Sequence, residues 1–134
     1  MSRPGHNAQR AIVLFAHGSR DPLWHRPIQA VADAIALRAP ATPVACAYLE
    51  LSTPDLHAAC AGLIGRGANA LNIVPMFLGV GKHAREDLPA LMTQIRQHWP
   101  DVDFQLQAAV GENPRLISLL ADIALGETGV QNPN

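Results

Sequence analysis

The chain has 134 residues, of which 49% are hydrophobic and 16% charged, and its formal net charge is −1. This length fits one compact domain and excludes a TIM barrel or a two-domain dehydrogenase. The balanced charge gives no sign of binding to nucleic acid or to an anionic membrane, and an aromatic content of 4% argues against base-stacking modules. Cys46 and Cys60 are not spaced as a zinc-binding pair, so we expect two reduced, buried thiols.

The sequence shows no targeting or membrane segment. No stretch approaches the ~18 consecutive apolar residues of a membrane-spanning helix. The apolar run at residues 11–16 is too short for a signal peptide. We therefore expect a cytoplasmic protein with no membrane partner. Its single domain should cover residues 11–126, between flexible tails at 1–10 and 127–134.

Four strand–helix units are predicted in chain order. Apolar runs favour strands at residues 11–16, 44–49, 70–77 and 103–110. Helical spacing of apolar residues favours helices that begin near residues 23–27, 54, 88 and 114. The glycine-containing segment 78–87 is expected to be a long loop.

Local signals define the ends of these helices. Thr53 is the expected N-cap of the second helix, with Pro54 at its first position. Asn113 and Pro114 should play the same parts in the last helix. That last helix is expected to bury an apolar stripe made of Leu116, Leu119, Leu120 and Ile123.

The alternation of strands and helices predicts the α/β class. We expect an open, parallel four-stranded sheet of order 2-1-3-4 with helices on both faces. In the fourth strand, Phe104, Leu106 and Ala108 alternate with glutamines, which is typical of an edge strand.

Three residues follow the ends of the first three strands and form the candidate site. These are His17, then Glu50, then His83 within the glycine loop. In a 2-1-3-4 sheet they converge on the switch point, where open α/β sheets bind ligands. Two histidines and a carboxylate suit a divalent metal with open coordination positions. Each can also accept a proton.

Other interpretations of these residues remain open. Each histidine could be an ordinary hydrogen-bonded residue at a strand end, and Glu50 a solvated side chain. Among the remaining histidines, only His25 lies close enough to the first loop to stay a candidate. A histidine phosphatase is disfavoured because Ala16 stands where that chemistry needs an arginine before the histidine.

Three segments together resemble the small class II chelatases of the CbiX type, which are sirohydrochlorin cobalto-, ferro- or nickel-chelatases. The first segment is His-Gly-Ser-Arg-Asp-Pro at residues 17–22. The second is Tyr-Leu-Glu-Leu at 48–51, followed by Pro-Asp at 54–55. The third and most specific runs from Pro75 through Gly79, Gly81 and His83 to Pro89.

The resemblance implies a flavodoxin-like chelatase half-domain that pairs as a homodimer. It implies that His17 and His83 bind the metal, that Glu50 acts with them, and that the loop leading to His83 contacts the macrocycle. Basic and N–H groups on the rim would bind the substrate carboxylates. The substrate-binding set is then Ser19, Arg20, Glu50, Leu78, Gly79, Val80, Gly81 and Lys82.

The implied reaction inserts a divalent metal into sirohydrochlorin in cobalamin or sirohaem biosynthesis. Co²⁺ is favoured, with Fe²⁺ and Ni²⁺ as alternatives, and the metal is a substrate, with no permanently bound cofactor. A carrier that binds metal or tetrapyrrole without turnover is the alternative function.

Overall fold

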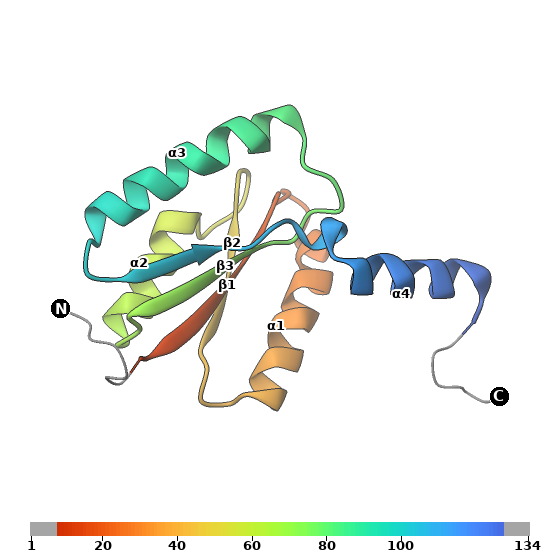
Figure 1. Cartoon of the computed structure of the whole chain (residues 1–134), viewed down its shortest axis with the longest axis horizontal. Coiled ribbons are helices and arrows are strands. Elements are labelled where there is room, and N and C mark those ends of the chain that lie inside the picture. The colour runs from red at the N-terminus through yellow and green to blue at the C-terminus, as the bar shows by residue number, and fades with distance from the viewer. Residues whose placement is uncertain (1–7, 128–134) are drawn as a thin grey trace.

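The computed structural model describes residues 8–127 (Figure 1). The predicted tails therefore lie mostly outside the described residues. The domain core alternates strands with helices, and short 3-10 helices precede α1 and α4. The elements in chain order are β1 Arg10–Ala16, η1 Pro22–His25, α1 Arg26–Arg38, β2 Val44–Tyr48, α2 Leu56–Gly65, β3 Ala70–Pro75, α3 Lys82–His98, β4 Asp103–Leu106, η2 Val110–Glu112 and α4 Pro114–Leu125.

The four strands form one parallel sheet of order β2-β1-β3-β4, as the sequence predicts. β1 lies in the middle, and five of its seven residues are buried, because a central parallel strand is covered on both faces. The chain moves from β1 outward to β2 and then returns to the other side of β1 for β3. This reversal of direction creates the switch point at the carboxyl ends of β1 and β3.

The two faces of the sheet are covered differently. On one face, Val13, Ile73 and Phe104 pack with residues of α2 and α3 in the main hydrophobic core. On the opposite face, α1 packs over β1 and β2. Register partners point to the same side of a sheet, so Ile12, Asn72 and Gln105 share this second face. We call its β3–β4 half, with Asn72, Val74 and Gln105, the open half-face.

The third helix differs from the prediction at its start. α3 begins at Lys82, so the loop before it ends at Gly81 and His83 lies in the first helical turn. The prediction was wrong because the glycines indicated a loop over residues 78–87, and the apolar spacing that marks the helix begins only at Leu88. Pro89 lies inside α3.

The start of the second helix also differs. Asp55, and not Thr53, is the N-cap of α2, and its carboxylate accepts the N–H of Ala58 at 2.8 Å. The predicted position of Pro54 in the first turn was wrong, because Pro54 precedes the cap and its carbonyl accepts the N–H of Tyr48.

The last helix begins and ends where the sequence predicts, but it is not buried as predicted. Asn113 caps α4 and Gly126 ends it with a φ of 77°. The predicted buried stripe is exposed, however: α4 has no buried residue, and Ile123 is 63% exposed. Figure 1 shows α4 projecting away from the sheet, and its main neighbour is η2. Leu106 of the edge strand β4 is 37% exposed.

No helix among residues 8–127 combines the length and apolar character that a bilayer-crossing segment requires.

Candidate functional site

The predicted site residues lie at the carboxyl edge of the sheet. His17 directly follows β1, Glu50 follows β2 by two residues, and His83 lies in the first turn of α3, which follows β3. The fold therefore brings all three segments to the switch point.

A cavity of about 420 Å³ opens at this edge. It brings together four residues that the sequence singled out: His17, Glu50, Gly81 and Lys82. The remaining lining residues are Leu49, Ala84 and Asp87. Asp87 was missed, because its segment was predicted to be a loop. With α3 starting at Lys82, residues 83 and 87 are one helical turn apart, and that spacing could have identified it.

The start of α3 gives the cavity hydrogen-bond donors. Gly81 is the N-cap of the helix and offers no side-chain capping bond. The first N–H groups of a helix are unpaired and attract anions. With the exposed ammonium of Lys82 beside them, these groups favour a ligand carboxylate at this wall.

The imidazole of His17 rests against an apolar support. Its ring lies 4.4 Å from that of Phe77, centroid to centroid, with an interplanar angle of 36°. Phe77 is 2% exposed and belongs to the core, whereas His17 is exposed. The ring therefore has one face fixed and can still reach a ligand from the cavity.

The backbones that carry His17 and Glu50 run side by side. The N–H of Leu49 donates to the carbonyl of Ala16 at 2.8 Å, and that of Glu50 donates to His17 at 3.1 Å. Gly18, with a φ of 92°, lies between them, and a Cβ on it would overlap the carbonyl oxygen of Glu50. Only glycine allows this approach.

The other predicted substrate-binding residues do not line this cavity. Ser19 uses its hydroxyl oxygen to accept the N–H of Asp21 at 3.0 Å, and Arg20 is exposed. In the loop before α3, Leu78 is 70% exposed and Gly79 is also exposed.

Val80 completes this set and packs partly against the core. Its carbonyl accepts Nη1 of Arg85 at 2.8 Å. The loop is therefore anchored at Val80, while Leu78 and Gly79 extend to solvent.

Two ionisable groups lie on β2 below the site. Burial raises the pKa of the Tyr48 hydroxyl above its ordinary value, and the neighbouring Cys46 adds to the shift. Burial also raises the pKa of Cys46, with a contribution from the carboxylate of Asp33. Both groups are therefore neutral near pH 7 and add no charge to the site. Both cysteines are free thiols, with Cys60 buried and Cys46 half-buried.

Among the side chains that the structure describes, no three His, Cys, Asp or Glu residues gather into a ready-made metal site.

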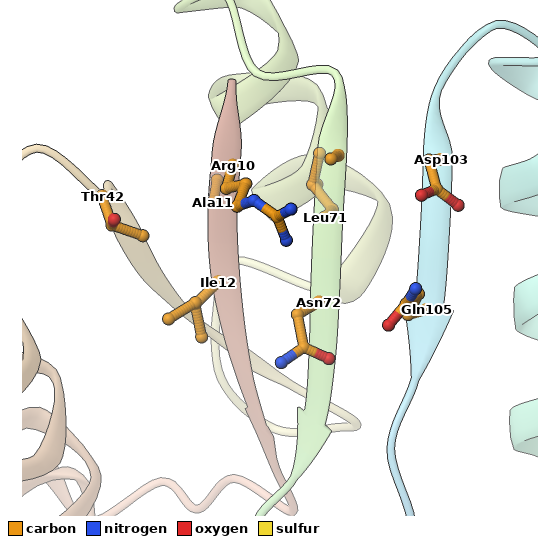
Figure 2. A pocket seen from close by; sticks show the side chains of 9 residues that line it. Arg10, Ala11, Ile12, Thr42, Leu71, Asn72, Asp103 and Gln105 are labelled. Atoms are coloured by element: carbon orange, nitrogen blue, oxygen red, sulfur yellow. The ribbon is translucent and has the colours of Figure 1, made fainter. Parts of the chain in front are cut away.

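A second cavity, of about 200 Å³, lies at the other end of the sheet (Figure 2). Arg10 from β1, Asn72 from β3, and Asp103 and Gln105 from β4 line it. The Oδ1 atom of Asn72 is buried there and has no hydrogen-bond partner among the side chains and backbone groups of the described residues. This cavity is part of the uncovered sheet surface, and it lies at the amino ends of the strands, far from His17.

Comparison with known proteins decides the family. The sequence model described as CbiX matches residues 11–124, which is almost the whole described domain. The chain belongs to the CbiX family. This match includes His17, Glu50 and His83, and therefore all three segments that meet at the carboxyl edge.

Individual relatives agree with this family. The chain is 28% identical to the sirohydrochlorin cobaltochelatase of Methanopyrus kandleri over 87% of its own length and 98% of the relative. It is 31% identical to the enzyme of the same name from Methanothermobacter thermautotrophicus, over 60% of this chain and 56% of the relative.

Solved structures share the fold. A protein described as a cobalamin (vitamin B12) biosynthesis CbiX protein, from Marinobacter aquaeolei VT8, superposes with a TM-score of 0.76 at 31% identity, covering 87% of this chain and 95% of that one. The sirohydrochlorin chelatase SirB of Bacillus subtilis, in complex with cobalt, gives 0.74 at 19% identity and shows the fold alone. The match covers 88% of this chain and 50% of SirB, so SirB is much the longer protein.

Proposed function

We propose that this CbiX-family protein is a sirohydrochlorin chelatase that inserts a divalent metal, with Co²⁺ preferred, into the tetrapyrrole. The observation that carries this proposal is the cavity in which His17, Glu50 and Lys82 meet from three separate segments. The names of the relatives support the substrate, and the frequency of cobaltochelatases among them supports the choice of cobalt. Fe²⁺ is the next candidate, because one relative is a sirohydrochlorin ferrochelatase.

The residues present suit the chemical steps of metal insertion. The pyrrole N–H protons of the ring must be removed and the metal must lose its water. A neutral imidazole near pH 7 can bind the metal or accept a proton, and the carboxylate of Glu50 can accept another. In this proposal His17 and His83 hold the metal substrate and Glu50 handles protons. His17 and Glu50 are exposed, so a metal ion or a substrate from solution can reach both side chains.

The substrate is a polycarboxylate, and we propose that it binds along the loop that precedes α3. Lys82 and the N–H groups at Gly81 would hold its carboxylates, since ion-assisted hydrogen bonds to anions are the strong ones. Leu78 and Gly79, exposed on the same loop, would contact the flat face of the macrocycle. Ser19 and Arg20 would complete the rim on the β1 side.

We infer further that residues 11–126 form a chelatase half-domain that works as a homodimer. A cavity of about 420 Å³ is at the small end of the range of roughly 300–1,000 Å³ for ligand sites, so it encloses only part of a wide macrocycle. The chain also leaves two surfaces uncovered, the apolar side of α4 and the open half-face of the sheet. The exposed apolar side of α4 in one copy could cover the open half-face in a second copy, and this match supports association of two copies.

The proposed activity is tested with His17→Ala and His83→Ala in an absorbance assay of Co²⁺ insertion into sirohydrochlorin. Each variant should lose most of the turnover while keeping the wild-type circular dichroism spectrum. His57→Ala, an exposed histidine on α2, is the matched control and should keep full activity. Full activity in both His17→Ala and His83→Ala would contradict the proposed site.

The proposed dimer is tested by sedimentation velocity. Ile123→Glu places a charge on the exposed side of α4 and should shift the protein from dimer to monomer. Leu37→Glu is the control, because Leu37 is 85% exposed on α1 and lies outside both uncovered surfaces. A wild-type protein that sediments as a monomer at micromolar concentration would contradict this inference.

A further inference from the structure

One serine hydroxyl joins the two loops that carry His17 and Glu50. Oγ of Ser52 donates to the carbonyl oxygen of Ser19 at 2.6 Å and accepts the N–H of Ser19 at 2.9 Å. Nε2 of His25 lies 2.9 Å from the same oxygen. Ser19 is two residues after His17 and Ser52 is two residues after Glu50, so this contact joins the two loops just beyond both functional residues. We call Ser19, His25 and Ser52 the loop clamp.

The hydrogen-bond capacity of a hydroxyl fixes the protonation of His25. A serine hydroxyl has one proton to donate and two lone pairs that accept. The proton points to the carbonyl of Ser19, and one lone pair receives the Ser19 N–H. Nε2 of His25 must therefore donate to the remaining lone pair. In the neutral ring, the proton is then on Nε2.

The clamp continues the pairing of β1 with β2 beyond the ends of the strands. The regular ladder ends with the bond from Glu50 N–H to the His17 carbonyl. Leu51 has a φ of 65°, so the backbone turns away and cannot supply the next bond. The side chain of Ser52 replaces it and bonds both polar backbone groups of Ser19.

His25 ties this contact to the body of the protein. Its ring stacks on Tyr48 at 4.5 Å between centroids, with an interplanar angle of 29°. Tyr48 is 5% exposed and is the last residue of β2. The half-buried His25 therefore connects the fixed end of β2 with the loop beyond it.

We propose that Ser52 and His25 are positioning residues for metal insertion, and that they hold His17 and Glu50 on one rim of the cavity. This inference rests on the proposed function. The side chains of His17 and Glu50 are exposed, and so the spacing of their backbones decides whether both reach one metal or one ring. A fixed spacing removes the ordering cost that mobile groups pay at each binding event.

Nuclear magnetic resonance at pH 8 tests whether the clamp exists, and this test needs no enzyme assay. The ¹⁵N shifts of the His25 ring should show the proton on Nε2, and Ser52→Ala should shift the Ser19 amide resonance. A His25 ring protonated on Nδ1 would overturn the inference.

The role of the clamp is tested with paired variants. Ser52→Ala removes all three bonds, while Ser52→Thr keeps the hydroxyl. His25→Phe keeps a ring on Tyr48 and removes the donor, while His25→Gln keeps a donor and removes the ring. Ser118→Ala, on the side of α4 that faces away from the apolar stripe of Leu116, Leu119, Leu120 and Ile123, is the control. Each variant is titrated with Co²⁺ alone and is assayed for kcat with sirohydrochlorin, after its melting temperature has shown that it is folded.

The inference predicts a pattern that loss of stability alone does not produce. Ser52→Ala and His25→Phe should each weaken Co²⁺ binding and lower kcat by about ten- to a hundred-fold, the usual effect of removing an outer positioning group. Ser52→Thr and His25→Gln should recover most of this loss. If Ser52→Ala and His25→Phe match Ser118→Ala in Co²⁺ affinity and kcat, the inference is wrong and the proposed function stands. If the wild-type protein neither binds Co²⁺ nor turns over, the proposed function itself fails.

Discussion

Gly18→Ala tests the close approach of the two site loops. At Gly18 an added Cβ would overlap the Glu50 carbonyl oxygen and would lie 3.1 Å from Cβ of Tyr48. The φ of 92° is also unfavourable for alanine. The substitution therefore introduces both backbone strain and a steric overlap.

Both effects lower the free energy of unfolding of Gly18→Ala. A left-handed backbone costs a residue with a Cβ roughly 1–2 kcal/mol. Relief of the overlap moves the Glu50 carbonyl on the order of 1 Å and weakens the bond from Glu50 N–H to His17, which is worth about 1 kcal/mol. We expect a total loss of about 2–3 kcal/mol in the free energy of unfolding. Because the shift separates His17 from Glu50, turnover should fall well beyond the loss of folded protein.

Alanine substitutions at two other glycines distinguish the effect of backbone strain from that of steric overlap. Gly67 has a φ of 104° and open space around it, while Gly79 has open space and no positive φ. By urea denaturation Gly67→Ala should cost about 1 kcal/mol, because the gain from a stiffer unfolded chain partly offsets the strain. Gly79→Ala should be close to neutral. The reasoning is refuted if Gly18→Ala is no more destabilising than Gly67→Ala and turns over at the wild-type rate.

Three further predictions follow from the same structure. A Cβ on Gly111 would overlap the carbonyl of Leu78. Gly111→Ala should therefore displace the loop before α3 and raise KM for sirohydrochlorin. An unchanged KM would count against a role for this loop in substrate binding. Burial raises the pKa of Cys60 to about 12, so the unfolded chain ionises first and stability falls as pH rises from about 9 towards 12. In urea titrations wild type should lose about 1.4 kcal/mol per pH unit more than Cys60→Ala in that range, and equal slopes would disprove this. Asp55→Ala should cost about 1 kcal/mol as the loss of an N-cap, whereas Thr53→Ala should cost almost nothing, and the reverse ranking would show that the cap is misassigned.

Much of the fold could be predicted from local patterns. The apolar runs identify β1 to β4, and the alternation of strands and helices predicts the observed order β2-β1-β3-β4. Asn113 and Pro114 predict the start of α4 because capping depends on neighbouring residues alone. The convergence of His17 and Glu50 on one cavity also follows from strand order.

The errors have physical causes that a local pattern does not contain. The first turns of α3 are polar and follow two glycines, so the glycines and the apolar spacing placed the helix start too late. The apolar stripe of α4 was predicted to be buried, but amphipathic spacing does not reveal whether the rest of the chain covers it. The loop clamp was also missed, since Ser52 and Ser19 are 33 residues apart in sequence and a serine at a loop position carries no signal of its partner.

Multiple-turnover insertion of Co²⁺ by the wild-type protein tests the central claim most directly. Sirohydrochlorin and Co²⁺ are supplied in large excess over the protein, and the absorbance of the metal-free ring is followed. The account predicts continuous conversion of many equivalents of sirohydrochlorin, faster than the reaction without protein. A spectral change that stops at one equivalent per site would identify a carrier, and a rate equal to the uncatalysed reaction would contradict the proposed function.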